Sequence, residues 1–430
     1  MAVGSVELGK GGKVINGPSI PDSKYFLIKQ LLKRSPYIHT FKPCLWFTGL
    51  FIHIHFLRIY ILHIAHTFKL KMAKYSAKQW FVKERTGDSL EVDKTFELVA
   101  KELSTDDLTE GQLLAKSLWF SNDPTQRLWI NKDSVEGRLY RAPIRNGEPM
   151  ETYGIYEIVE SKAADHKKGD LVFARGHWSD YCVLDTDSKG DPGAFLFPVM
   201  GDPTDLLTLG VTGITAYFGL LTVGAATSKD STIVVSVAAG ATGSLVCQIA
   251  KNVLGIKNVV GIAGSDTKCE LLKKSCGCDY ALNYRSPSFK DDFKEATKDD
   301  IDLYFDNVGG EILDMALVRM KEFGRVVACG AISLYDDMKG PGGKAASAGI
   351  SSDAWIQVVC HKIRIEGFIV LQFADQIMKA LTDLGTWAAE GKVHLIKDIW
   401  EAKVEDVPQG MLKLLKGENT GKLITKVVHS

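Results

Sequence analysis

Hydrophobic and polar positions alternate in short runs through the first part of the chain, between residues 79 and 183. Runs such as Phe96–Ala100 and Leu113–Phe120 are separated by acidic and glycine-containing turns, a pattern typical of half-buried β-strands. The stretch 154–183 continues in the same way, and Lys168-Gly169-Asp170 forms a tight-turn signal before a strand. This part of the chain therefore predicts a mostly β unit.

The pattern changes near residue 200. Between Ser231 and Val260 the chain gives a β-branched strand, a turn of small residues, an amphipathic helix and a second strand, which together predict a βαβ unit. Further apolar strands end at Phe305, Cys329 and Phe368, and each is separated from the last by enough chain for a helix. We therefore expect an α/β fold with a doubly wound parallel sheet.

The N-terminal part has a different composition. Residues 1–80 carry twelve Lys and Arg but only two acids. The net charge of the whole chain is zero, so residues 81–430 are acidic overall. The stretch Pro43–Phe68 is long enough to span a bilayer, yet Arg58 near its centre and four histidines make it a poor anchor. We expect translation to begin naturally at Met72, which makes residues 1–71 a basic apolar extension; a membrane anchor or organelle signal and a folded extension are the alternatives.

The charge distribution and the cysteines bear on the partners, location and metal content to be expected. The basic segment is apolar and His-rich rather than a Lys/Arg stripe, so no nucleic-acid partner is expected. The eight cysteines follow no disulfide framework, which favours a reducing, cytoplasmic location. The pair Cys276-Gly-Cys278 is open to two interpretations, a metal site or two buried thiols; without a second pair at zinc spacing, thiols are favoured and no metal is expected.

A nucleotide site is predicted after the first strand of the βαβ unit. Gly240 to Gly243 lie between a strand and a helix N-terminus, where glycines let the backbone approach a pyrophosphate, although a simple tight turn is the alternative. The second strand ends in Gly261 to Ser265 without the acid that usually binds the ribose of NAD. Lys268 follows closely, which favours NADP; a solvated lysine beside Asp266 is the other interpretation.

Five segments in this order resemble a known family: VAAGATGSLVCQIAK, GSDTK, Asn283-Tyr284, FDNVGG and CGAISLY. SNDPTQR, GVTGITAYFGL and GENTGK support the match, which covers residues 79–428. The set is similar to the leukotriene B4 12-hydroxydehydrogenase/prostaglandin reductase (alkenal/one oxidoreductase) family of zinc-independent medium-chain dehydrogenase/reductases. The resemblance implies a GroES-like substrate domain of residues 72–200 and 370–430 and a Rossmann domain of residues 201–369.

The resemblance also implies site residues. Lys268 and Tyr284 would hold a 2′-phosphate, and turn residues would face the pyrophosphate. Asn307 and Tyr335 also have simpler interpretations, as a turn cap and as core packing. The full set of implied NADP-binding residues is Gly240, Ala241, Thr242, Gly243, Lys268, Tyr284, Asn307, Cys329, Gly330, Ala331, Tyr335, Phe368, Ile369, Val370 and Asn419.

By the same resemblance, the reaction is NADPH-dependent reduction of the carbon-carbon double bond of a small conjugated ketone or aldehyde, without zinc. Tyr335 and Tyr217 are the candidate donors to the enolate. Where zinc enzymes carry Gly-His-Glu, this chain has Tyr153-Gly154-Ile155-Tyr156-Glu157. Two departures from the family concern the substrate pocket: Thr125 replaces an aromatic residue, and Cys360 stands where several relatives have tyrosine.

Two other functions remain open on the sequence alone. The first is a secondary-metabolite (polyketide-type) tailoring dehydrogenase or enoyl reductase, whose site residues would look alike. The second is a non-catalytic NADPH-binding protein, which the loss of pocket aromatics makes conceivable. Relatives are commonly dimers, so the resemblance implies a homodimer.

Overall fold

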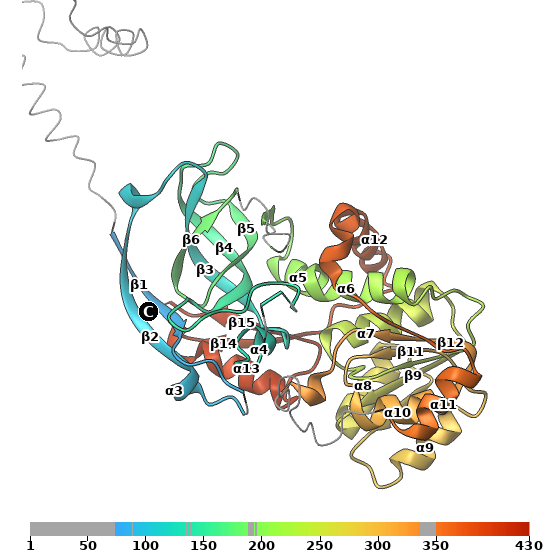
Figure 1. Ribbon diagram of the computed structural model, residues 1–430. Helices are drawn as coiled ribbons and strands as arrows, with labels where there is room; N and C mark the ends of the chain where they lie inside the picture. The colour runs from blue at the N-terminus through green and yellow to red at the C-terminus, as the bar shows by residue number, and fades with distance from the viewer. Residues whose placement is uncertain are drawn as a thin grey trace, which may run out of the picture. The chain divides into compact units, whose positions relative to one another are not determined.

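The structure is a computed structural model (Figure 1) that describes residues 74–87, 89–134, 136–137, 139–187, 193, 196–335 and 350–429. The expected extension of residues 1–71, with its anchor candidate at 43–68, lies outside the described residues.

The part of the chain between residues 232 and 367 forms a six-stranded parallel sheet. Its strand order is β10-β9-β8-β11-β12-β13, so the chain runs outward from β8 to one edge and then returns to the other side of β8. The strands are β8 Thr232–Val235, β9 Asn258–Ala263, β10 Tyr280–Asn283, β11 Ile301–Asp306, β12 Met320–Ala328 and β13 Arg364–Gly367. This is the expected doubly wound sheet, and its order reverses between β8 and β11, where such folds bind ligands.

Alternating side chains of β8 pack in two separate hydrophobic clusters, one on each face of the sheet. Ile233 and Val235 belong to a cluster formed with the helices α6, α7 and α12, whereas Val234 packs with α9, α10 and α11 on the other face. Since both faces are covered, all four residues of the strand are buried, and three of them are apolar. The helices are α6 Ile214–Tyr217, α7 Ala241–Gln248, α8 Asp266–Ser275, α9 Phe289–Ala296, α10 Gly310–Leu317, α11 Ser352–Cys360 and α12 Ile377–Ala389.

The other unit is mostly β, as expected from the alternating pattern. Its larger sheet has the order β14-β15-β3-β4-β5-β7, with β6 also paired to β3, and β1 and β2 form an antiparallel pair. The strands are β1 Lys74–Val82, β2 Phe96–Ser104, β3 Gln112–Ser121, β4 Glu151–Ser161, β5 Leu171–His177, β6 Tyr181–Asp185, β7 Leu196–Pro198, β14 Lys397–Ala402 and β15 Lys422–Val427. Early and late parts of the chain thus share one sheet.

Among the described residues, the segment Pro203–Val223 is long and apolar enough to cross a bilayer by length and composition. It contains α5 (Pro203–Thr208) and α6, and 67% of its apolar window is buried within the structure. Ile214, Phe218 and Leu220 pack in the core cluster on the α7 side of the parallel sheet. Burial against the sheet accounts for this apolar run, as in the core helix of a globular domain.

Candidate active site

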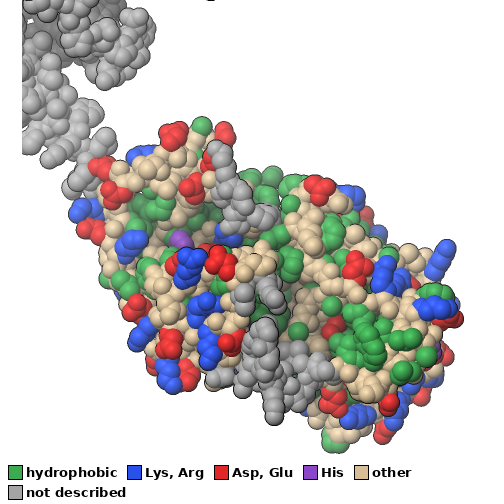
Figure 2. All heavy atoms as spheres, in the orientation of Figure 1, with side chains coloured by type: hydrophobic (Ala, Val, Ile, Leu, Met, Phe, Trp, Pro, Cys, Tyr) green, Lys and Arg blue, Asp and Glu red, His purple; other side chains and the backbone are tan. Residues whose placement is uncertain are grey.

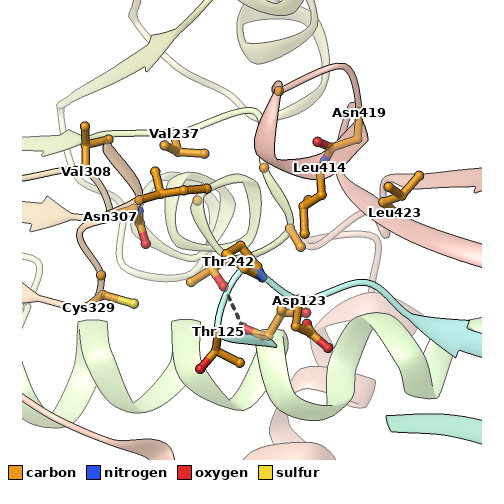
Figure 3. A pocket seen from close by; sticks show the side chains of 18 of the residues that line it. Asp123, Thr125, Val237, Thr242, Asn307, Val308, Cys329, Leu414, Asn419 and Leu423 are labelled. Carbon is orange, nitrogen blue, oxygen red and sulfur yellow. Dashed lines mark hydrogen bonds between the residues drawn. The ribbon is translucent and has the colours of Figure 1, made fainter. Parts of the chain in front are cut away.

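A cavity of about 590 Å³ opens beside the carboxyl ends of the parallel strands (Figure 3). Its walls come from both units: Asn307 and Cys329 follow β11 and β12, whereas Asp123 and Thr125 follow β3. The predicted cofactor residues that line it are Gly240, Ala241, Thr242, Gly243, Lys268, Tyr284, Asn307, Cys329, Gly330, Tyr335, Phe368, Ile369, Val370 and Asn419.

Two predicted site residues are not among those that line the cavity, Ala331 and Tyr217. The Tyr217 hydroxyl donates to Asp383 over 2.6 Å, and its ring stacks on Trp387 with the centroids 5.8 Å apart. Tyr217 therefore lies on the side of α6 that faces α12, and the structure does not bring this candidate donor to the cavity.

The glycine turn between β8 and α7 has the geometry of an anion site. Gly240 caps α7 without any side-chain hydrogen bond, so the first N–H groups of the helix remain available to a ligand. A Cβ on Gly243 would lie 2.3 Å from the Val237 carbonyl oxygen, which only a glycine avoids. Val237 itself has φ 47°, a left-handed conformation that is costly for a β-branched residue and is held by this turn.

The far end of the cavity, beyond β9, is cationic. Lys268, Tyr284 and Arg285 line it, and Asp123 is the only acid among the described lining residues. Asp266, which left the role of Lys268 open, accepts a hydrogen bond from the Asn283 amide over 2.8 Å.

Lys268 itself is partly buried at this end. Burial, with a smaller effect from Arg285, lowers its pKa, and its ammonium donates to the Gly417 carbonyl over 2.7 Å. Sequence reasoning missed Arg285, although it directly follows the Asn283-Tyr284 motif.

The carboxyl end of β11 is fixed by a buried acid. Asp306, 3% exposed, accepts hydrogen bonds from the backbone N–H groups of Val308 and Gly309, each over 3.0 Å. Burial raises its pKa, while these backbone donors oppose the shift. Next to it, the Asn307 side chain donates to the Ser236 carbonyl over 2.7 Å. Asn307 thus joins the end of β11 to the end of β8 and also lines the cavity, whereas the turn after β11 is capped by Asp306.

Two weak acids near these strand ends are kept neutral. Burial raises the pKa of the Tyr335 hydroxyl to about 12. Burial, together with the charge of Asp306, also raises the pKa of the Cys329 thiol to about 12. At neutral pH both groups are protonated, so the Tyr335 hydroxyl can donate a hydrogen bond but does not act as a base.

The wall from the β unit carries aromatic residues that the sequence did not single out as a group. Trp129 ends the short helix α4 (Gln126–Trp129), Tyr140 lies in the loop that follows, and Tyr153 lies in β4. The Tyr153 hydroxyl donates to the Gly193 carbonyl over 2.8 Å. Trp129 and Tyr140 belong to no motif, so only the folded chain reveals them.

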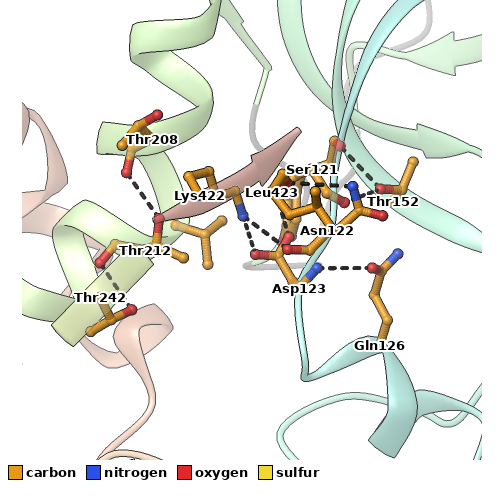
Figure 4. Close-up of polar contacts among 12 residues, drawn as sticks. Ser121, Asn122, Asp123, Gln126, Thr152, Thr208, Thr212, Thr242, Lys422 and Leu423 are labelled. Atoms are coloured by element: carbon orange, nitrogen blue, oxygen red, sulfur yellow. Dashed lines mark hydrogen bonds and ion pairs between the residues drawn. The ribbon is translucent and has the colours of Figure 1, made fainter. Parts of the chain in front are cut away.

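A buried ion pair closes the floor of the cavity (Figure 4). The Lys422 ammonium lies 2.6 Å from a carboxylate oxygen of Asp123, and the two side chains are 1% and 4% exposed. The other Asp123 oxygen accepts from Ser121 over 2.5 Å. Just before Lys422, the Gly421 N–H donates to the Ala239 carbonyl in the glycine turn over 2.7 Å. The start of β15 therefore contacts both walls.

Among the described residues, no group of three or more His, Cys, Asp or Glu side chains is arranged to hold a metal ion. Cys276 and Cys278 are buried free thiols. Independence from zinc stays a prediction.

Two family models match this chain. One, described as the N-terminal domain of oxidoreductase, matches residues 78–189, and the other, described as zinc-binding dehydrogenase, matches residues 241–385. Prostaglandin reductase 1 of Oryctolagus cuniculus is 36% identical over 364 residues, which cover 82% of this chain and 94% of that protein. The NADPH-dependent curcumin reductase of Escherichia coli is 31% identical, over 82% and 98% of the two chains.

Solved structures agree. The crystal structure of CurA from Vibrio vulnificus in complex with NADPH has a TM-score of 0.70 and 27% identity, and the match covers 82% of this chain and all of that one. The fold and the two family models together define an oxidoreductase of the medium-chain dehydrogenase/reductase class. Within that class, the chain belongs to the prostaglandin reductase family, which confirms the resemblance seen in the sequence.

The geometry of the glycine turn leads to a stability prediction. Replacing Gly243 by Ala places a Cβ against backbone atoms that cannot move aside, so we expect the free energy of unfolding to fall by about 1 to 3 kcal/mol in urea denaturation. Gly385, in α12, is the matched control because nothing lies within 4 Å of its added Cβ. Gly385→Ala should raise stability by about 0.5 to 1 kcal/mol. If the two variants changed the free energy of unfolding by the same amount, the glycine turn would have room for a Cβ.

Proposed function

We propose that the protein uses NADPH to reduce the carbon-carbon double bond of small α,β-unsaturated ketones or aldehydes. The observation that carries this proposal is one continuous cavity that joins a glycine turn and a cationic end to the neutral donor Tyr335. The names of the relatives support it, since one is an NADPH-dependent reductase and others are prostaglandin reductases. A conjugated carbonyl compound of small size is the proposed substrate.

The cavity fits NADP in several places. Glycine backbone and the uncapped start of α7 suit the pyrophosphate, because a Cβ at Gly243 would fill the space that the backbone leaves. Lys268, Arg285 and Tyr284 suit the 2′-phosphate, which carries the negative charge that NAD lacks. Asn307, Cys329, Phe368 and the segment to Val370, with Asn419 on the opposite wall, are proposed to line the remainder.

When bound, NADPH supplies the hydride that the β-carbon of the substrate accepts. The protein's part is to hold the alkene in place and to stabilise the charge that develops on the carbonyl oxygen. We assign the second task to the Tyr335 hydroxyl, which burial keeps protonated, and solvent is the proposed proton source for the α-carbon. Tyr217 is left out of this assignment because its hydroxyl is bound to Asp383.

We assign cofactor binding and substrate binding to different domains. We propose that residues 201–369 form the cofactor domain and that residues 72–200 and 370–430, apart from α12, form the substrate domain. In the structure α12 packs in the core cluster of the parallel sheet through Ile377, Ala380 and Leu384, whereas β14 and β15 join the β unit.

The first experiment follows cofactor oxidation by absorbance with NADPH and NADH against enals, enones and simple aldehydes. We expect turnover of the conjugated compounds with NADPH. In Lys268→Ala the KM for NADPH should rise about tenfold or more, because a charge-assisted contact is lost, while the KM for NADH stays unchanged. Lys273→Ala, an exposed lysine on the same helix, is the control.

Two other outcomes would count against the proposal. NADPH binding without oxidation of any compound would favour the non-catalytic protein. Product analysis that shows reduction only of a complex secondary metabolite would favour the tailoring reductase.

The role of Tyr335 predicts a pH-independent effect. Tyr335→Phe should lower kcat about 100-fold, the usual loss for one oxyanion donor, with little change in NADPH affinity. Because burial raises the pKa to about 12 from the ordinary 10.0, the hydroxyl keeps its proton, so the ratio of wild-type to variant kcat should stay constant between pH ~6 and ~10. Tyr217→Phe is the control and should leave kcat unchanged. A ratio that collapses near pH 9 would contradict the assignment.

We also propose a homodimer, with β13 and α11 at the interface. β13 is an edge strand whose four residues are all exposed, and the neighbouring apolar side chains form the patch seen over α10 and α11 in Figure 2. Trp355 is 54% exposed, Val359 62% and Phe323 65%. Sedimentation of the wild type should give a dimer and Trp355→Glu a monomer, whereas Met378→Glu, exposed on α12, should not dissociate it. A wild-type monomer at micromolar concentration would refute the proposal.

A further inference from the structure

The wall of the cavity that comes from the β unit contains a pair of hydroxyl groups in direct contact. The Thr125 hydroxyl and the Tyr140 hydroxyl lie 2.5 Å apart, and the Trp129 indole N–H donates to the same Tyr140 oxygen, also over 2.5 Å. All three side chains line the cavity. Thr125 stands where the family carries an aromatic residue, so a tyrosine from a different loop supplies the phenol on this wall.

The pair is held rigidly. Trp129 is 2% exposed, and the Arg141 guanidinium lies over its ring, 4.5 Å from the centroid. Arg141 in turn forms an ion pair with Glu151 over 2.7 Å. The indole can only donate, so it fixes the Tyr140 oxygen as an acceptor and sets the direction of the remaining bonds.

One hydroxyl proton of the Thr125–Tyr140 pair has no acceptor within the pair. Thr125 and Tyr140 have two O–H groups between them, and their mutual contact uses one, whichever of them donates. No other acceptor among the described residues takes the second O–H. The other tyrosine of this wall, Tyr153, differs because its hydroxyl is committed to the Gly193 carbonyl.

We propose that the Thr125–Tyr140 pair determines specificity by donating its free O–H to a second oxygen of the substrate, away from the conjugated carbonyl. This inference rests on the proposed function, in which Tyr335 on the cofactor side binds the carbonyl oxygen. The pair lies on the wall contributed by the β unit, so it reaches the other end of a substrate that spans the cavity. The favoured class is a conjugated ketone or aldehyde that also bears a ketone or other acceptor oxygen at its far end.

The test uses two benzylideneacetones of matched shape, one with a para-acetyl and one with a para-isopropyl group, and the full-length protein. The acetyl group also activates the enone electronically, but this effect is common to all variants and cancels when they are compared. The ratio of kcat/KM for the acetyl compound to that for the isopropyl compound should therefore be about five- to tenfold higher in the wild type than in the Thr125→Val/Tyr140→Phe double variant, the effect of one neutral hydrogen bond. Thr125→Val and Tyr140→Phe each leave one O–H, so each should keep most of this increase in the ratio. Only the double variant should lose it.

Controls separate this result from a loss of structure or of the reaction. Thr125→Ser keeps the hydroxyl and should keep the preference for the acetyl compound. Melting temperatures show whether Tyr140→Phe, which leaves the Trp129 N–H without its acceptor, still folds. Binding of the two saturated analogues to the NADPH complex, measured by calorimetry, tests the preference even if reduction fails. A double variant whose acetyl-to-isopropyl ratio equals that of the wild type, or a single variant whose ratio falls to that of the double variant, would overturn the proposal.

Discussion

The buried ion pair between Lys422 and Asp123 is the contact on which the cavity depends. It joins the start of β15 to the segment that follows β3, and the same stretch of backbone bonds to the glycine turn through Gly421. Removing one partner of a buried pair leaves an uncompensated charge, at a cost of about 3 to 5 kcal/mol. The cavity wall from the β unit, the glycine turn and the loop with Asn419 are therefore held in one arrangement by a few adjacent residues.

Charge is distributed along the cavity in a way that matches its proposed chemistry. Lys268 and Arg285 line the end beyond β9, whereas Tyr335 and Cys329, near the ends of β11 and β12, are uncharged groups whose pKa burial raises further. A cationic end suits phosphate, and a neutral, poorly solvated end strengthens a hydrogen bond to a developing oxyanion. Anchoring and reaction are thus separated within one cavity.

The sequence predicted the features that depend on the succession of neighbouring elements along the chain. The glycine turn, the strands of the parallel sheet and the position of Lys268 follow from a strand, a turn and a helix in succession, and the structure has them in that order. Tyr217 could not be placed in this way, because a helix of small and apolar residues gives no sign of which side faces the cavity. Trp129 and Tyr140 lie outside any periodic pattern, and the hydrogen bonds of Tyr140 with Trp129 and Thr125 form only when the loop folds back.

The order of elements along the chain also bears on how the molecule folds. Lys422 and Asp123 are separated by 299 residues, and β15 follows all other described strands in sequence. Until β15 arrives, the Asp123 carboxylate lacks its counter-ion and β3 lacks a neighbour on that side, while β8 to β13 already have theirs. Contacts at such long range form late because the intervening chain must first be ordered. During synthesis the part built on the parallel sheet can thus form first, and the cavity is completed only when the last strand docks.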